Sequence, residues 1–159
     1  MSAAGFDSGL SAWPGAVTLL TIAEGRDDIG TTVTAFCPVS ASPPTVLVSL
    51  IASAYPAEVL GRVDRFAVTL LSAAQRTLAG RFAAAGRPGA RLLLSNVPHA
   101  RGETSGALIP AGGLAAFECE VMARVPAADH VLFVAHVLAV PYVAESGEPL
   151  IRFRDGYLR

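Results

Sequence analysis

Short runs of apolar and β-branched residues, each bounded by glycine, proline or charged residues, dominate the hydrophobic pattern of this chain. Runs of this length that are rich in Val, Ile and Thr are typical of β-strands. The run at 45–51 is almost continuously apolar, so we expect both of its faces to be buried. The predicted strands are residues 15–24, 31–37, 45–51, 66–71, 114–125, 130–142 and 150–153.

Two segments carry a helical pattern instead. Residues 55–63 form one short helical stretch between two predicted strands. Ser72 is a plausible N-cap for a second helix over 73–85, in which Leu78 and Phe82 stand one turn apart. The chain is therefore predicted to place a helix after its third strand and another after its fourth.

This order of elements predicts the fold class. A doubly wound sheet needs a helix after nearly every strand, whereas most strands here are joined by short turns. We therefore expect a mainly β fold, a closed or split antiparallel β-barrel with two packed helices. Residues 1–14 are predicted to be an N-terminal arm, residues 15–159 a single domain, and residues 92–106 a long loop.

The composition indicates that part of the surface is covered. Hydrophobic residues make up 52% of the chain and charged residues 16%, against about 25% charged in an average soluble domain. So few charges leave apolar surface that has to meet another subunit or a flat ligand. We expect a homodimer.

The charges exclude several function classes. The formal net charge is −1, without the basic surface of a nucleic-acid-binding protein. All 12 basic residues are arginines, which removes Schiff-base and P-loop lysine chemistry. Arginine is therefore the only strong cation available for a phosphate.

The remaining sequence features argue against a membrane protein and against a metal site. Residues 29–57 carry no charge, but prolines interrupt this run, so we do not expect it to span a membrane. The N-terminus lacks the basic start of a signal peptide, and we expect a cytoplasmic protein. Cys37 and Cys119 have no metal-ligand spacing and are predicted to be buried free thiols.

Three polar clusters are candidates for chemistry, although no dinucleotide, P-loop or hydrolase motif is present. They are residues 30–36, residues 49–53, and the second helix with Arg76, Arg81 and Phe82. Each also has an ordinary explanation. Threonine is a good strand former, serine caps helices and helix arginines are usually solvated.

The chain resembles the flavin reductase family, whose members fold as the FMN-binding split barrel. No single motif is specific, but their order and spacing together are. The motifs are Ala16–Thr21, the segment GTTVTAFCPVS from Gly30 to Ser40, Pro43-Pro44 with Thr45–Leu50, Phe66–Leu71, Gln75, Leu78, Phe82-Ala83, Phe117-Glu118-Cys119, Asp129-His130, Gly147–Leu150, Phe153, Gly156 and Tyr157. One departure is clear: the family often has Asn-Arg-Ser-Ser where this chain has residues 51–54, Ile-Ala-Ser-Ala.

The resemblance implies NADH- or NADPH-dependent reduction of FMN or FAD at a dimer interface, with a monooxygenase as the partner that receives the reduced flavin. It implies that His130 positions the nicotinamide. The expected cofactor-binding residues are Thr32, Val33, Thr34, Ala35, Phe36, Ser49, Ser53, Gln75, Arg81 and Phe82. Two other functions stay open: a flavin carrier or relative of pyridoxamine-phosphate oxidase, and a structural dimer without flavin.

Overall fold

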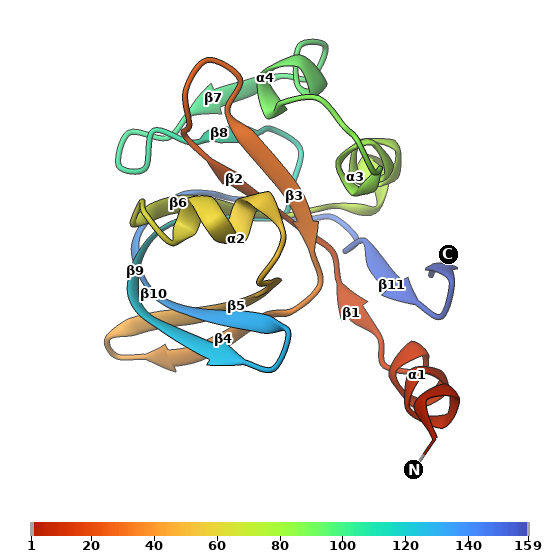
Figure 1. The fold of residues 1–159 in the computed structure, drawn as a ribbon. Helices are drawn as coiled ribbons and strands as arrows, with labels where there is room; N and C mark the ends of the chain where they lie inside the picture. Colours follow the sequence, from red (N-terminus) through yellow and green to blue (C-terminus); the bar gives the residue numbers. More distant parts are fainter. Residues whose placement is uncertain (1, 159) are drawn as a thin grey trace.

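The computed structural model describes residues 2–158 (Figure 1). Its centre is a seven-stranded antiparallel sheet with the order β3-β2-β6-β9-β10-β5-β4. The sheet curves into a barrel, as the alternation of strands and short turns predicts. Its strands are β2 (Thr18–Ile22), β3 (Ile29–Val33), β4 (Phe36–Ala41), β5 (Pro44–Ile51), β6 (Arg65–Leu70), β9 (Ala115–Ala127) and β10 (His130–Val143).

Smaller elements surround this barrel. Three short strands form a separate sheet, β1 (Gly15–Ala16), β11 (Ile151–Phe153) and β12 (Gly156–Tyr157), and a hairpin joins β7 (His99–Arg101) to β8 (Leu108–Pro110). The helices are α1 (Ala3–Ser11), α2 (Tyr55–Leu60), the 3-10 turn η1 (Ala73–Gln75), α3 (Arg76–Ala83) and α4 (Ala90–Leu93). Helix α1 occupies most of the expected N-terminal arm. None of the helices in residues 2–158 is long and apolar enough to cross a membrane.

The predicted strand 31–37 is in fact two strands, and the break between them is the seam of the barrel. β3 and β4 are the two ends of the sheet, and only Thr34 and Ala35 separate them in the sequence. The chain has to turn at these residues to pass from one end of the sheet to the other, so one straight strand is impossible. The carbonyl of Ala35 accepts a hydrogen bond of 3.0 Å from the amide of Ser49 on β5.

Alternating side chains of the strands fill the barrel. Leu20, Val48, Phe66 and Phe133 are at most 1% exposed, and α2 covers one open end of this core (Figure 1). On β5, however, only one face is fully buried, contrary to the prediction for residues 45–51. The side chain of Ser49 on its other face is half-buried, because that face borders the seam.

The predicted loop 92–106 contains the last two residues of α4 and the strand β7, so the prediction was wrong at these residues. Hydrogen bonds to Glu118, a residue of β9 that is 2% exposed, hold this segment in place. One carboxylate oxygen of Glu118 accepts hydrogen bonds from the amides of Thr104 (3.1 Å) and Ser105 (2.7 Å) and from the Ser105 hydroxyl (2.6 Å). A carboxylate from a distant strand therefore fixes a segment whose own residues favour turns.

The two cysteines differ in their environment. Cys119 on β9 is buried, as expected, and burial beside Glu118 raises the pKa of its thiol to about 12. Cys37 is exposed because β4 is an edge strand with one side open. The prediction of a buried thiol was therefore wrong for Cys37.

Candidate functional site

A cleft opens along the seam of the barrel, where β3, β5 and the start of β10 meet. We name it the seam cleft; its volume is about 380 Å³, which is in the range of small-ligand sites. It is lined by Thr31, Thr32, Val33, Thr34, Ala35, Ser49, Leu50, Ile51, Ala54, Pro56, Arg87 and His130. Among these described residues there are hydroxyls, one arginine and one histidine, but no carboxylate.

The fold explains why hydroxyls gather here. Thr18 and Thr21 on β2 use their hydroxyls inside the protein, donating to the carbonyls of Val33 (2.6 Å) and Leu108 (2.7 Å). The hydroxyls on β3 and β5, by contrast, lie beside the seam, where the two ends of the sheet do not pair. Thr32 and Ser49 line the cleft there. Polar side chains on otherwise apolar strands are therefore available to a ligand.

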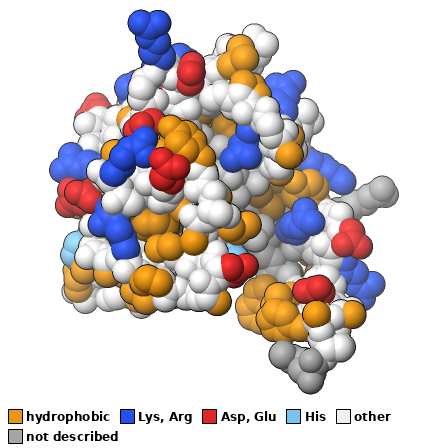
Figure 2. Space-filling view, viewed as in Figure 1, with side chains coloured by type: hydrophobic (Ala, Val, Ile, Leu, Met, Phe, Trp, Pro, Cys, Tyr) orange, Lys and Arg blue, Asp and Glu red, His pale blue; other side chains and the backbone are white. Residues whose placement is uncertain are grey.

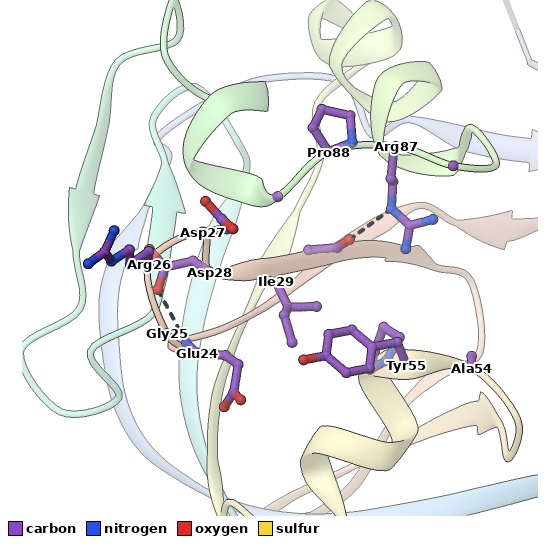
Figure 3. A pocket seen from close by; sticks show the side chains of 14 residues that line it. Glu24, Gly25, Arg26, Asp27, Asp28, Ile29, Ala54, Tyr55, Arg87 and Pro88 are labelled. Carbon is purple, nitrogen blue, oxygen red and sulfur yellow. Dashed lines mark hydrogen bonds between the residues drawn. The ribbon is translucent and has the colours of Figure 1, made fainter.

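Arg87 supplies the positive charge of the seam cleft. Its Nε donates to the carbonyl of Gly30 (3.0 Å) and its Nη1 to the carbonyl of Ala84 (3.3 Å), and Figure 3 shows the side chain reaching toward β3. No carboxylate of residues 2–158 pairs with it within 4.0 Å, and burial lowers the pKa of its guanidinium. A partly desolvated cation without a counter-ion is a favourable place for an anion such as phosphate.

A second hollow of about 540 Å³ lies on the other side of Arg87 (Figure 3). We name it the turn cavity, because residues 24–30, the turn between β2 and β3, form one wall. The start of α2 and residues 86–89 form the others. The turn cavity and the seam cleft share Ala54, Pro56 and Arg87 as lining residues, so the two are adjacent.

His130 stands at the rim of the seam cleft. It is the first residue of β10 and lies opposite Ile51 of β5 in the sheet. Its Nδ1 is 2.8 Å from a carboxylate oxygen of Asp129, and this hydrogen bond lowers the pKa of Asp129. With Nδ1 on Asp129, the other ring nitrogen, Nε2, makes no hydrogen bond within the described residues.

The structure brings together six of the eleven residues expected from the sequence. The six that line the seam cleft are Thr32, Val33, Thr34, Ala35, Ser49 and His130. Two others lie near it without lining it. Phe36 stacks on Phe117 with ring centroids 6.1 Å apart, and Ser53 is exposed in the turn that follows β5.

The other three expected residues lie away from the cleft. Gln75 caps its own helical turn, accepting from the amide of Ser72 (3.1 Å) and donating to the carbonyl of Ala111 (2.9 Å). Arg81 is exposed on α3. Phe82 is completely buried in the core between α3 and β3. These three residues therefore hold structural or surface positions and do not line the seam cleft.

Sequence reasoning missed Arg87. It lies in the segment 84–91, whose Gly and Pro residues indicate only the end of a helix. The available signal was that all cations are arginines and that this one stands among small and apolar residues. That signal does not say which element the loop folds against.

Comparison with known proteins shows the family of this chain. The profile of the family described as "Flavin reductase like domain" matches residues 10–159. An NADH-dependent FMN reductase of Streptomyces nodosus subsp. asukaensis is 32% identical over 155 residues, covering 96% of this chain and 82% of the relative. The reductase component of 4-hydroxyphenylacetate 3-monooxygenase from Thermus thermophilus is 32% identical over 154 residues, covering 97% and 94%.

Solved structures show the same fold. The NADH:FAD oxidoreductase of Streptomyces globisporus, in complex with NAD and FAD fragments, has a TM-score of 0.89 and 28% identity, and the match covers 98% of this chain and 91% of that chain. The flavin reductase component of a bacterial two-component tryptophan halogenase has a TM-score of 0.90 and 27% identity, with coverage of 99% and 97%. Motifs, fold and sequence similarity lead to one conclusion: this chain belongs to the flavin reductase family.

Proposed function

We propose that this protein is an NAD(P)H:flavin oxidoreductase that holds FMN or FAD in the seam cleft. The observation that carries the proposal is the chemistry of the lining. The cleft combines hydroxyls, exposed backbone and an unpaired arginine with no carboxylate. This set suits a flat ring system joined to a phosphate, and it disfavours a cationic ligand.

The cleft fits both ends of a flavin. Thr34 and Ala35 are exposed at the seam, between the ends of β3 and β4. Because the carbonyl of Ala35 already accepts from the Ser49 amide, the peptide N–H groups of Thr34 and Ala35 are the candidates for the polar edge of an isoalloxazine ring. Ser49 and Arg87 are the candidates for the phosphate. Arg87 thus takes the place that the sequence assigned to Arg81, and it compensates for the missing Asn-Arg pair at residues 51–52.

The protein's part in the reaction is positioning. A bound flavin supplies the hydride-accepting chemistry, so the chain needs neither a nucleophile nor a metal. The chain has to hold the nicotinamide against the flavin and exclude water between them. We assign the nicotinamide ring or its amide to His130, whose Nδ1 contacts Asp129 at the rim of the cleft.

Flavin titration followed by NADH turnover tests this proposal. We expect the purified protein to bind FMN or FAD and the bound flavin to lose its yellow colour with NADH. Arg87→Gln should weaken flavin binding about ten- to a hundredfold, because a charge-assisted hydrogen bond contributes about 1.5–3 kcal/mol. Arg81→Gln is the matched control and should bind like wild type.

The alternatives give different results in the same experiment. A protein that binds flavin but does not react with NADH or NADPH is a carrier or a relative of pyridoxamine-phosphate oxidase. A protein that binds neither flavin is a structural barrel, and the proposal is then wrong. Equal effects of Arg87→Gln and Arg81→Gln would remove Arg87 from the site.

A homodimer and a monooxygenase partner belong to the same proposal. Hydrophobic side chains are exposed on the lower part of the barrel and on α1 (Figure 2), as expected of a chain with a covered surface. Several relatives are named as reductase components of monooxygenases. We expect reduced flavin to leave the cleft and to support a flavin-dependent monooxygenase added in a separate chamber across a dialysis membrane.

A further inference from the structure

The seam cleft is only half of a longer depression. The turn cavity, which lies on the other side of Arg87, has a volume of about 540 Å³. A mononucleotide flavin ends at its phosphate, so a phosphate on Arg87 would leave the turn cavity empty. A dinucleotide flavin continues past that point with a second phosphate, a ribose and an adenine.

The turn cavity has walls suited to a flat base. Tyr55 is 53% exposed, and Figure 3 shows its ring beneath Ile29, with the hydroxyl directed toward Glu24. Pro56 and Pro88 add apolar surface. An exposed aromatic ring in a cavity is a stacking platform for a heteroaromatic base.

The charges of the turn cavity are also compatible with a diphosphate beside a ribose. Two of the three carboxylates that line the cavity already form ion pairs. Asp28 pairs with Arg91 (3.1 Å) and Arg101 (2.9 Å). Glu24 pairs with Arg62 (2.5 Å). Asp27 remains as an acceptor for hydroxyl or amino groups. Arg26 also lines the cavity, but Figure 3 shows its side chain directed away from Arg87, so Arg87 is the cation that the described lining offers to the diphosphate.

We propose that the turn cavity is the subsite for the adenosine half of a dinucleotide flavin, so that the protein binds FAD more tightly than FMN. This inference rests on the proposed function, since it takes the flavin ring to lie in the seam cleft. Tyr55 is then the residue that determines specificity. It has no role in binding FMN.

Titrations of riboflavin, FMN and FAD, followed by flavin fluorescence in the absence of nicotinamide, test the inference. We expect affinity to rise from riboflavin to FMN, because the phosphate gains a contact with Arg87, and from FMN to FAD by about tenfold, because the adenine stacks on Tyr55. Tyr55→Ala should reduce FAD affinity to that of FMN and leave FMN affinity unchanged. Tyr55→Phe, which keeps the ring, should retain the preference.

A second variant guards against misfolding of Tyr55→Ala. Pro88→Trp at the exposed wall narrows the turn cavity and should lower FAD affinity while FMN affinity stays the same. Equal affinities for FMN and FAD in the wild type, or equal losses of both in the variants, would overturn the subsite and leave the proposed function intact. Failure of all three flavins to bind would overturn both.

Discussion

At the scale of single residues, the sequence predicts which side chains can bind a ligand better than it predicts where in the fold those side chains lie. The hydroxyls of Thr32 and Ser49 stand out as polar residues on apolar strands, and both line the cleft. Arg81 and Arg87 cannot be distinguished in this way, because both are arginines near the end of one helix. Only the packing of α3 against β3 turns Arg81 outward and brings Arg87 to the carbonyl of Gly30.

His130 carries the first prediction at this scale. His130→Ala should slow the reduction of bound flavin about fivefold and leave flavin affinity nearly unchanged, because one neutral hydrogen bond is worth about 1 kcal/mol and each 1.4 kcal/mol is tenfold in rate. Stopped-flow reduction by NADH measures this. His136→Ala, further along β10 and outside the cleft, is the control. Equal rates in His130→Ala and wild type would make His130 a solvated surface residue.

The second prediction at this scale concerns the carboxyl group of Asp28. Burial on its own raises the pKa of Asp28, but hydrogen bonds from Arg101 and Arg91 outweigh it and hold the pKa below its ordinary value. A carboxyl whose pKa is lower in the folded state stabilises the fold above the unfolded value, and this contribution disappears as the pH falls through the folded pKa. The ionised form of Asp28 should therefore contribute at neutral pH and not in acid.

Urea unfolding of Asp28→Asn tests this pH dependence. We expect a loss of about 2 kcal/mol in the free energy of unfolding at pH 7, less than for a fully buried pair because both arginines are about half exposed. The difference from wild type should shrink below a pH of about 4. Asp27→Asn, at the exposed neighbouring position, should change little. A difference that persists in acid would mean that shape, rather than charge, makes Asp28 matter.

At the scale of elements, hydrophobic periodicity predicts strands well where one apolar run corresponds to one uninterrupted strand. The strands expected at 66–71, 114–125 and 130–142 all lie within a few residues of β6, β9 and β10. The pattern fails where a distant contact decides. At residues 34–35 the chain has to turn from β3 to β4, which lie at opposite ends of the sheet. In the segment 92–106, hydrogen bonds to Glu118 on β9 determine the conformation. Neither contact is encoded within the segment that it shapes.

The packing of α3 on β3 gives a prediction at this scale. A Cβ added at Gly30 would lie 2.3 Å from a ring carbon of Phe82, so Gly30→Ala should lower the free energy of unfolding by about 1–3 kcal/mol through overpacking. Adding Phe82→Leu makes room, and the double variant should lose less than the sum of the two single variants. Gly80→Ala on α3, whose Cβ meets nothing within 4 Å, is the control. Additive losses would mean that the ring does not contact Gly30 in solution.

At the scale of the whole molecule, composition and surface area lead to the same expectation. A compact monomer of 16.4 kDa should expose about 7,500 Å², whereas this chain exposes 8802 Å². Part of the difference comes from α1, which projects from the barrel and has no buried residue (Figure 1). Large hydrophobic side chains on β10 remain exposed, including Leu138, Val140 and Val143. Surface of this kind is typical of a chain that is covered by a second copy.

Light scattering should therefore give a dimer mass at micromolar concentration, with an interface of roughly 2,000 Å² or more in total. Leu138→Arg should dissociate the dimer, because an arginine placed in an apolar contact loses its hydration without gaining a counter-ion. Leu92→Arg on α4, where the leucine is 66% exposed and far from β10 in the chain, should remain a dimer. If a second copy completes the flavin site, the Leu138→Arg monomer keeps its circular-dichroism spectrum but binds flavin more weakly. A wild-type monomer that binds flavin at full affinity would contradict the dimer and show that the seam cleft is complete within one chain.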